Sequence, residues 1–415
     1  MLHLLRSLTP NQRGAVIASY LGWTLDAFDF FILVFVLKDV AQEFHTNLES
    51  VTYAIFLTLA ARPIGALLFG RAADRYGRRV TLMADILLFS ILEFASGLAP
   101  SFTIFLFLRL AFGVAMGGEW GVGAALTMET IPPGTRGVVS GVLQTGYPSG
   151  YLLAATTYFA LYGQLGWRGM FVIGALPALL VLFIRAKVEE SPVFLARAHL
   201  RQGAGLVRML RDNSGRFLYA VALMTAFNFL SHGTQDLYPA FLQLQRHFSQ
   251  HTVGLIAIFY NIGAILGGLL FGALSQRIGR RRAILVAALL TLPLIPVWAY
   301  GSGPVALAVG AFLMQFAVQG AWGVVPAHLN ELSPEEMRGT FPGFAYQLGN
   351  LLASPTATIQ AGIAEAKGGN YAFALAIVAA IVAVTLAVLA IFGIEAHGVK
   401  FAGAQVHPDN SSPRP

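Results

Sequence analysis

The sequence predicts an all-α membrane protein with twelve transmembrane helices in two pseudo-symmetric six-helix bundles. The chain of 415 residues is strongly apolar, with a mean hydropathy of +0.67 and only 11% charged residues, whereas soluble domains carry about 25%. Twelve apolar stretches have the length of a membrane span. Motifs of the first half also recur in the second half, 202 positions later. Together these observations indicate a duplicated helical membrane fold.

Three motifs carry the repeat: the loop 70–79, Trp120-Gly121-Val122 and Glu129-x-x-Pro132-x-x-x-Arg136-Gly137. They recur at 272–281, at Trp322 and at Glu331. One spacing fits all three, so the chain reads as a duplicated unit of roughly 200 residues, and in an apolar chain the substrate site is expected where the two units meet.

A membrane-spanning helix needs about 20 mostly apolar residues. In the first half, such stretches lie at 14–37, 51–71, 80–98, 102–126, 138–163 and 168–186. In the second half, they lie at 217–242, 252–274, 283–301, 303–328, 339–364 and 370–394. The one long connection follows the sixth stretch. We therefore expect an N-terminal bundle over 1–188, a linker over 189–215, a C-terminal bundle over 216–395 and a disordered polar tail over 396–415.

Basic residues separate these spans on one side. With the N-terminus inside, the inner segments hold 21 of the 27 Lys and Arg residues: Arg6, Arg13, 71–79, Arg136, 185–216, 277–282, Arg338 and the tail. The outer loops hold only Lys38, Arg168, Arg246 and Lys367. The positive-inside rule then predicts cytoplasmic termini and an inner or plasma membrane location. No small-residue cleavage site follows the first span, so we expect no signal peptide.

The loop after the second span resembles the signature loop of the major facilitator superfamily: it reads Gly70-x-x-x-Asp74-Arg75-x-Gly77-Arg78-Arg79. Arg109-x-x-x-Gly113-x-x-x-Gly117 is similar to the second motif of that superfamily. The resemblance implies that Gly70, Asp74, Arg75, Gly77 and Arg78 gate the transporter and do not bind substrate. The second copy of the loop has Gln276 in place of Asp74, so it lacks this gating charge.

Two further motifs resemble one branch of the superfamily. The first span contains Asp26-x-x-Asp29-Phe30, which resembles a signature of proton-coupled organic-acid symporters. The seventh contains Asn228-x-x-Ser231-His232-x-x-x-Asp236, which is similar to a motif of the Jen-type lactate and pyruvate permeases in the sialate:proton symporter family. The resemblance implies proton-coupled transport of a monocarboxylate, and the twelve spans favour this branch over sialate permeases with extra spans.

Ionisable side chains inside a span cost roughly 2.5–3.5 kcal/mol each and are functional candidates by default. The spans of the first half hold two bases, Arg62 and Arg109, against five acids: Asp26, Asp29, Asp85, Glu93 and Glu119. Full ionisation would leave three negative charges uncompensated. Because burial disfavours the charged carboxyl, at least one acid should hold a proton. The chain can therefore exchange protons without a metal or a cofactor.

Residue counting puts Asp26 about 18 Å from the inner face, and Arg62 at a similar depth, so the two are expected to pair near the midplane. Asp29 shares a helix face with Asp26. One arginine beside two carboxylates leaves a carboxylate free to titrate. Arg62 is thus the expected anion ligand, with Asp26 and Asp29 as the protonation site, and a purely structural ion pair is the alternative.

In the seventh span, Asn228, His232 and Asp236 follow one another at intervals of four residues and share one face, with Gln235 beside them. His232 is the expected proton-sensitive donor to an organic anion. Asp236 is expected to orient the histidine or to gate, because a carboxylate would repel the substrate. A structural histidine is the alternative.

Other polar residues at membrane depth are also candidates. Gln347, Gln144 and Tyr147 are expected to contact substrate. Glu119 is either a proton relay or a tie to Asp85 through a shared proton. Arg109 belongs either to the proton pathway or to a helix tie with Glu93.

Composition excludes several other classes. The chain has no Cys, so it has neither disulfides nor a thiolate metal site. It has no phosphate-binding loop for an ATP-driven pump and no nucleophile–base set for an enzyme. We expect a monomeric symporter that binds a proton and a small monocarboxylate such as lactate or pyruvate, and needs no cofactor or nucleic acid. A larger acid, such as sialate or an aromatic acid, is the alternative.

Overall fold

A computed structural model describes residues 7–196 and 210–401, and every regular element within them is helical. The first half contains α2 (Pro10–Glu43), α3 (Leu48–Tyr76), α4 (Arg78–Gly97), α5 (Phe102–Thr130), η1 (Pro133–Thr135), α6 (Arg136–Gln144), α7 (Gly146–Ile173), α8 (Ala178–Lys187) and α9 (Pro192–Ala196). The second half contains α11 (Ser214–Gln235), α12 (Tyr238–Leu244), α13 (Gln250–Ile278), α14 (Arg280–Tyr300), α15 (Gly303–Trp322), α16 (Val325–Leu332), η3 (Glu335–Met337), α17 (Phe341–Ala353), α18 (Thr356–Ala366) and α19 (Tyr371–Phe392).

The twelve predicted spans all correspond to helices, but they differ in regularity. Within the described residues, eight helices are long and apolar enough to cross a membrane unaided. α7 contains the end of span five and the start of span six, which meet at a turn at Gly166, whose φ is +61°, and span six then bends by 43° into α8. Spans seven and eleven are each divided into two shorter helices, α11–α12 and α17–α18.

The interruptions lie close to prolines. Pro239 follows the break between α11 and α12, and Pro355 lies at the break between α17 and α18. Proline removes a backbone donor and clashes with the preceding turn, so helices bend or restart there. Membrane proteins tolerate such breaks where the freed backbone is buried in protein or lines a cavity. Of the predicted linker and tail, residues 197–209 and 402–415 lie outside the described part.

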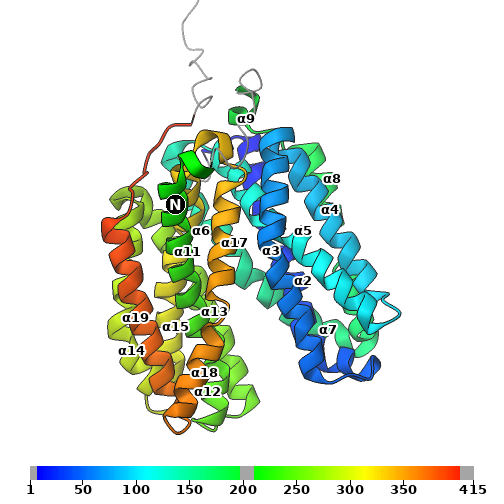
Figure 1. Ribbon diagram of the computed structural model, residues 1–415, viewed down its shortest axis with the longest axis vertical. Helices are drawn as coiled ribbons and strands as arrows, with labels where there is room; N and C mark the ends of the chain where they lie inside the picture. Colours follow the sequence, from blue (N-terminus) through cyan, green and yellow to red (C-terminus); the bar gives the residue numbers. More distant parts are fainter. Residues whose placement is uncertain (1–6, 197–209, 402–415) are drawn as a thin grey trace, which may run out of the picture.

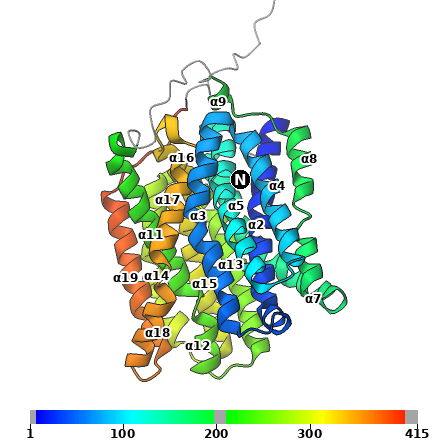
Figure 2. The same cartoon turned by 45° about the vertical axis from the view of Figure 1, so that its right-hand side comes forward.

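The helices form two bundles that follow the sequence repeat (Figure 1). The first half of the chain, blue through cyan to the green of α8, lies beside the second half, which runs from green to red. A turned view keeps α19 on one side of the molecule and α8 on the other (Figure 2). We call the end of the molecule that carries the loops 71–79 and 277–282 the basic end. Towards this end the helices of the two bundles converge, and towards the other end they splay apart (Figure 1).

Glycines allow the close contacts at the basic end. A Cβ on Gly121 of α5 would lie 2.7 Å from the Cα of Gly343 in α17, and one on Gly141 of α6 would lie 2.5 Å from the carbonyl oxygen of Gly268 in α13. Small residues of this kind let membrane helices approach through their backbones. The same device inside the first bundle brings α5 onto α3, where a Cβ on Gly117 would meet the carbonyl of Arg62.

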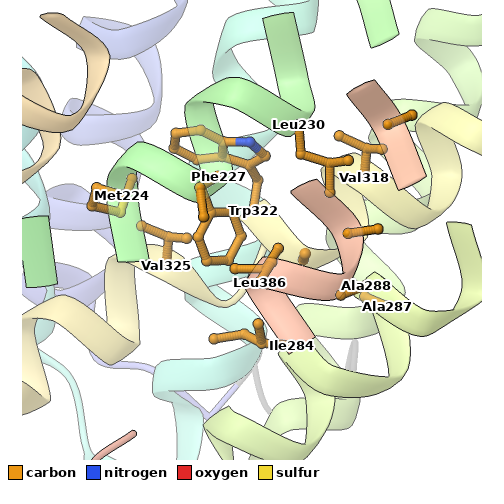
Figure 3. Close-up of a cluster of buried hydrophobic side chains, with 14 of the residues drawn as sticks. Met224, Phe227, Leu230, Ile284, Ala287, Ala288, Val318, Trp322, Val325 and Leu386 are labelled. Atoms are coloured by element: carbon orange, nitrogen blue, oxygen red, sulfur yellow. The ribbon is translucent and has the colours of Figure 1, made fainter. Parts of the chain in front are cut away.

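The two bundles have different interiors. The C-terminal bundle has one large apolar cluster, in which Phe227, Leu230 and Trp322 pack against α14 and α19 (Figure 3). The N-terminal bundle has smaller clusters, one around Phe89 and Phe112 and another around Phe105 and Phe171. The predicted spans within α2, α3, α4 and α5 of the first bundle also bury seven charged residues: Asp26, Asp29, Arg62, Asp85, Glu93, Arg109 and Glu119.

Candidate substrate and proton site

Arg62 on α3 lies at the centre of the buried charges, and its side chain is almost fully buried. Its Nη2 is 3.8 Å from Asp26 Oδ2 and 2.7 Å from the sulfur of Met116. Its Nε has no hydrogen-bond partner among the described residues. The expected pairing with Asp26 is therefore present, but it is long. Since a thioether is a weak acceptor, Arg62 retains donors for an additional anion.

Four carboxyl groups in the first bundle are fully buried and accept no hydrogen bond from any described residue: Asp26, Asp29, Asp85 and Glu119. The Glu119 carboxylate lies against Gly22 of α2, where a Cβ would come within 2.2 Å of Oε1. A cavity of about 10 Å³ lies beside it, which is the lower limit for one water molecule. An ionised carboxylate without donors is very costly in such surroundings, so these groups are suited to carrying protons.

Arg109 of α5 is held much more tightly than Arg62. Its Nη2 is 2.7 Å from Glu93 Oε2 and 2.5 Å from Ser96 Oγ. The guanidinium also lies over the ring of Phe112, 4.3 Å from the centroid. This geometry matches the expected helix tie between α4 and α5. A part for Arg109 in the proton pathway stays a prediction.

Removing one partner of this tie is expected to destabilise the protein. Glu93→Leu leaves the charge of Arg109 buried without its ion-pair partner, and breaking a buried ion pair in this way costs about 3–5 kcal/mol. The double substitution Glu93→Leu with Arg109→Leu is expected to recover most of that loss, because no unpaired cation remains. Thermal unfolding of the purified variants measures both effects. An equal loss of stability in the single and double variants contradicts the assignment.

His232 on α11 is held at both ring nitrogens. Nδ1 is 3.0 Å from Asp236 Oδ2, and Nε2 is 3.0 Å from Asn350 Oδ1 of α17. The spacing along α11 thus brings Asp236 to the position expected for orienting the imidazole. Asn350 was not predicted as the second partner of His232, because that contact joins different helices.

The other polar residues of α11 have partners of their own. Asn228 donates from Nδ2 to the carbonyl of Met224, 2.8 Å away. Gln235 donates to Oε1 of Gln315 on α15, 2.7 Å away. Both residues thus already use part of their hydrogen-bonding capacity within the second bundle.

Gln347 has the opposite character. It is buried at 1% exposure on α17, and neither polar atom of its side chain has a partner among the described residues. Gln144 ends α6 and accepts a 3.4 Å hydrogen bond from Trp120 Nε1. Tyr147, on α7, packs against Trp23 with ring centroids 5.5 Å apart. Gln347 is therefore the predicted amide with the most hydrogen-bonding capacity left for a ligand.

Aromatic residues that were not predicted as site residues line the same region. Tyr346 packs against Trp120 of the first bundle, with centroids 4.8 Å apart, and against Trp322 of its own bundle, 5.5 Å away. Trp120 and Trp322 occupy equivalent positions in the two repeats. Trp23 and Trp322 both leave Nε1 without a partner among the described residues. The repetition of Trp-Gly-Val in the two halves was the available signal for this arrangement.

The predicted gating residues lie at the basic end, where the bundles touch. Asp74 accepts hydrogen bonds from Gly339 N at 2.7 Å and from Thr340 Oγ1 at 2.6 Å, both in the second bundle. Gly70 lies one turn earlier, against the backbone of Thr340. Gly77 ends α3 with a φ of +111°, a conformation that glycine adopts at little cost. Arg75 lies over the ring of Tyr76.

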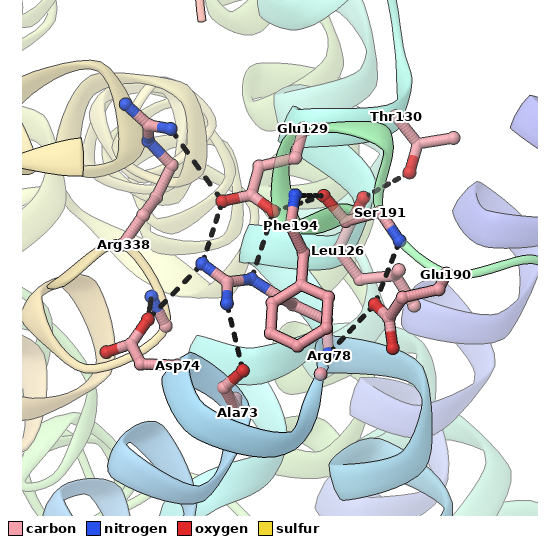
Figure 4. Close-up of polar contacts among 12 residues, drawn as sticks. Ala73, Asp74, Arg78, Leu126, Glu129, Thr130, Glu190, Ser191, Phe194 and Arg338 are labelled. Atoms are coloured by element: carbon pink, nitrogen blue, oxygen red, sulfur yellow. Dashed lines mark hydrogen bonds and ion pairs between the residues drawn. The ribbon is translucent and has the colours of Figure 1, made fainter. Parts of the chain in front are cut away.

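Arg78 joins Asp74 to a wider network (Figure 4). Its guanidinium is 3.2 Å from Asp74 and 3.0 Å from Glu129 of α5. Arg338 of the second bundle lies 3.7 Å from the same Glu129. The Glu190 carboxylate accepts from the backbone N–H of Arg78 at the start of α4. Charged residues from both halves thus hold the two bundles together at the basic end.

The second copy of the loop keeps the contact although it lacks the charge. Gln276 Oε1 accepts from the backbone N–H of Gly137 at 2.8 Å, which is the repeat equivalent of the bond from Gly339 to Asp74. The expected loss of the gating charge is therefore real, but an amide oxygen takes its place as acceptor. Both halves hold the interface in the same way.

Two helical bundles related by a sequence repeat, the first of them with buried ionisable groups, are typical of secondary transporters. The family model of the Major Facilitator Superfamily matches residues 19–249 and 221–408. The chain belongs to this superfamily, and it is accordingly a multi-pass membrane transporter and not an enzyme.

Sequence similarity to described transport proteins supports this membership. The chain is 29% identical to a carboxylic acid transporter protein homolog of Saccharomyces cerevisiae, over 87% of this chain and 63% of that protein, so it spans less than two thirds of that relative. It is 30% identical to a probable 4-methylmuconolactone transporter of Cupriavidus pinatubonensis, over 88% of this chain and 90% of the relative. It is 25% identical to the sialic acid transporter NanX of Escherichia coli, over 83% and 85%.

The fold is also similar to a solved structure. The proton:xylose symporter XylE bound to 6-bromo-6-deoxy-D-glucose superposes with a TM-score of 0.77 and 19% identity, over 94% of this chain and 98% of that chain. At this identity the likeness concerns the fold alone.

Proposed function

We propose that the chain is a proton-coupled symporter that carries a small monocarboxylate, of the size of lactate or pyruvate, by alternating access. The observation that supports this most directly is Arg62, a buried cation whose single ion pair is long and whose Nε is unpartnered among the described residues. A carboxylate in a low-dielectric cavity needs a fixed cation, and a planar guanidinium can hold it with two parallel hydrogen bonds.

In this proposal Arg62 and His232 donate to the substrate carboxylate, and His232 Nε2 releases Asn350 Oδ1 to do so. Gln347, Asn228 and Gln235 select its polar substituents, and Gln144 and Tyr147 complete the wall on the side of the first bundle. The unpartnered amide of Gln347 supports its assignment best.

The proton is carried by Asp26 and Asp29, with Glu119 as a relay towards the basic end and with Asp236 and Arg109 holding the network in place. The lack of donors to the first three carboxyls supports this, since each is stable in such surroundings when protonated. Binding of one anion and one proton leaves the cavity with unchanged net charge, so the loaded transporter can occlude without burying a new charge.

Alternation in this proposal opens the contacts at the basic end. Asp74 must release Gly339 and Thr340, and Gly70 must separate from the same segment. Gly77, Arg75 and Arg78 maintain the conformation of the loop 70–79, so that these contacts can form again. We further propose that the protein acts as a monomer in the inner or plasma membrane, with both termini in the cytoplasm.

Membership in the sialate:proton symporter family, next to the Jen-type permeases, is the branch we propose. The relatives named for carboxylic acid and sialic acid transport support it. A larger ring-containing or unsaturated acid is the second candidate. The rings of Trp120, Tyr346 and Trp322 favour it, as do relatives named for cis,cis-muconate and niacin transport.

Uptake into proteoliposomes separates these possibilities. With an inward proton gradient, labelled lactate or pyruvate is expected to accumulate, and unlabelled monocarboxylates of two to four carbons are expected to compete. Sialate and hexoses are expected not to compete. Stronger competition by niacin or muconate than by lactate selects the second candidate. Strong competition by a sugar without a carboxylate contradicts both.

A further inference from the structure

A second cavity opens at the basic end of the C-terminal bundle, away from the central site. Its volume is about 560 Å³. It is bounded by the end of α13, the start of α14 and the end of α19, and its lining includes Arg277, Arg281, Arg282, Leu285, Ile391 and Glu395. None of these residues takes part in the proposed transport mechanism.

The charges in this cavity are only partly used by the protein. Arg281 donates from Nε to the carbonyl of Ala390 at 2.7 Å, and from Nη2 to the carbonyl of Ile391. Arg277 and Arg282 are exposed and make no ion pair within 7–196 and 210–401. Three guanidinium groups therefore surround one carboxylate, that of Glu395.

That carboxylate is already occupied by the start of α14. Glu395 accepts backbone hydrogen bonds from Arg280 at 3.3 Å and from Arg281 at 3.0 Å. Partial burial opposes its ionisation, but these backbone donors and that of His397 hold the pKa of Glu395 below its ordinary value. The carboxylate is thus ionised and bound to the helix start. The two outer arginines, Arg277 and Arg282, remain for a ligand.

The equivalent place in the first bundle is closed. There, the ring of Phe194 lies 5.2 Å from the guanidinium carbon of Arg78, and a Cβ on Gly77 would lie 3.2 Å from that ring. In the second bundle, Glu395 is the only described residue that a Cβ on Gly279 would meet within 4 Å. The position equivalent to Arg282 is Val80. The open basic cavity is therefore specific to the second half and is not a by-product of the duplicated gate.

Apolar surface continues from the rim of the cavity along the outside of the bundle. Leu285 lines the cavity, and Val286, Leu289 and Phe392 are exposed on α14 and α19, with Phe392 at 81%. Side chains of this kind at the outside of a membrane bundle face acyl chains. A basic pocket at the point where transmembrane helices leave the bilayer is suited to anionic headgroups, and arginine grips phosphate oxygens in pairs.

We propose that this cavity binds the phosphodiester headgroup of an anionic phospholipid, with the acyl chains lying along α14 and α19. Arg277 and Arg282 hold the phosphate from the rim, and Arg281 is the fixed inner donor. The continuity of the cavity with the apolar surface favours a lipid over a free anion.

The test uses the full chain, purified in a neutral detergent, and phosphatidylglycerol binding measured by native mass spectrometry against phosphatidylcholine. The double substitution Arg277→Gln with Arg282→Gln removes the two unpaired charges. We expect it to bind phosphatidylglycerol roughly 25-fold more weakly, which is about fivefold for each arginine beside an anionic lipid. The matched control, Arg185→Gln with Arg216→Gln, removes two exposed charges from the same end of the molecule, and it is expected to bind within about twofold of the parent.

Three outcomes overturn the proposal. The first is an equal loss of binding in the control, which would indicate unspecific attraction to the basic end. The second is unchanged phosphatidylglycerol binding in the double variant. The third is displacement of the lipid by millimolar glycerol phosphate, which would make the cavity a site for a soluble anion. A preference for phosphatidylglycerol that depends on the two arginines and resists glycerol phosphate supports the lipid site.

Discussion

Replacing Arg62 by alanine is expected to abolish substrate binding, weakening it roughly 100-fold or more, because removing one member of a buried, hydrogen-bonded charge pair costs several kcal/mol. Arg62→Lys keeps the charge but loses the planar fork, so a clear loss of roughly tenfold is expected. Titration of the purified protein with lactate or pyruvate, by calorimetry or by ligand-induced thermal stabilisation, measures both.

Arg109 supplies the matched control. It is also buried in a span of the first bundle, but Glu93 and Ser96 already hold its Nη2. Arg109→Lys is therefore expected to lower thermal stability and to leave affinity within about threefold. Unchanged affinity in a folded Arg62→Ala protein would falsify the proposed site and make Arg109 the leading candidate for the anion ligand.

The sequence was sufficient for the parts of the structure that depend on local composition. Apolar length located all twelve spans, and a helical turn count placed Asp26 and Arg62 at one depth, where the structure pairs them. The same count matched Arg109 with Glu93. Inside a membrane an unpaired charge is so costly that depth alone restricts its partners, which is why these pairs could be predicted.

Contacts between the bundles could not be predicted in the same way. Asp74 lies beside Arg78, as its charge suggests, but its partners in the other bundle are backbone and hydroxyl donors at Gly339 and Thr340. A backbone N–H has no signature in the sequence. For the same reason, Gln276 looked like the loss of a function, whereas its amide oxygen preserves the equivalent bond.

The aromatic wall was missed for a related reason. Trp120 and Trp322 were recognised as repeat equivalents, but their common neighbour Tyr346 is brought between them only by the packing of α17 against both bundles. Likewise, Asn350 reaches His232 from another helix. Periodicity shows which residues share a face of one helix, but it does not show which faces meet. The roles of these residues in transport stay predictions.

Replacing Asp26 by asparagine is expected to uncouple transport from the proton gradient. The substitution keeps the shape of the side chain but removes its titration, so the positive charge of Arg62 is no longer balanced by a group that can release a proton. In this variant the anion can still bind and cross by exchange, but a pH gradient can no longer drive its accumulation. In the parent protein, one-to-one symport would raise the accumulation ratio by about tenfold for each pH unit. Asp29→Asn is expected to act in the same direction, since Asp29 is also fully buried without a donor among the described residues.

The matched control is Asp39→Asn, near the other end of α2 and less buried, which should accumulate substrate normally. Uptake and counterflow measured side by side in proteoliposomes distinguish the two activities. Full gradient-driven accumulation in both Asp26→Asn and Asp29→Asn would remove the pair from the coupling mechanism and leave Glu119 as the next carboxyl to test.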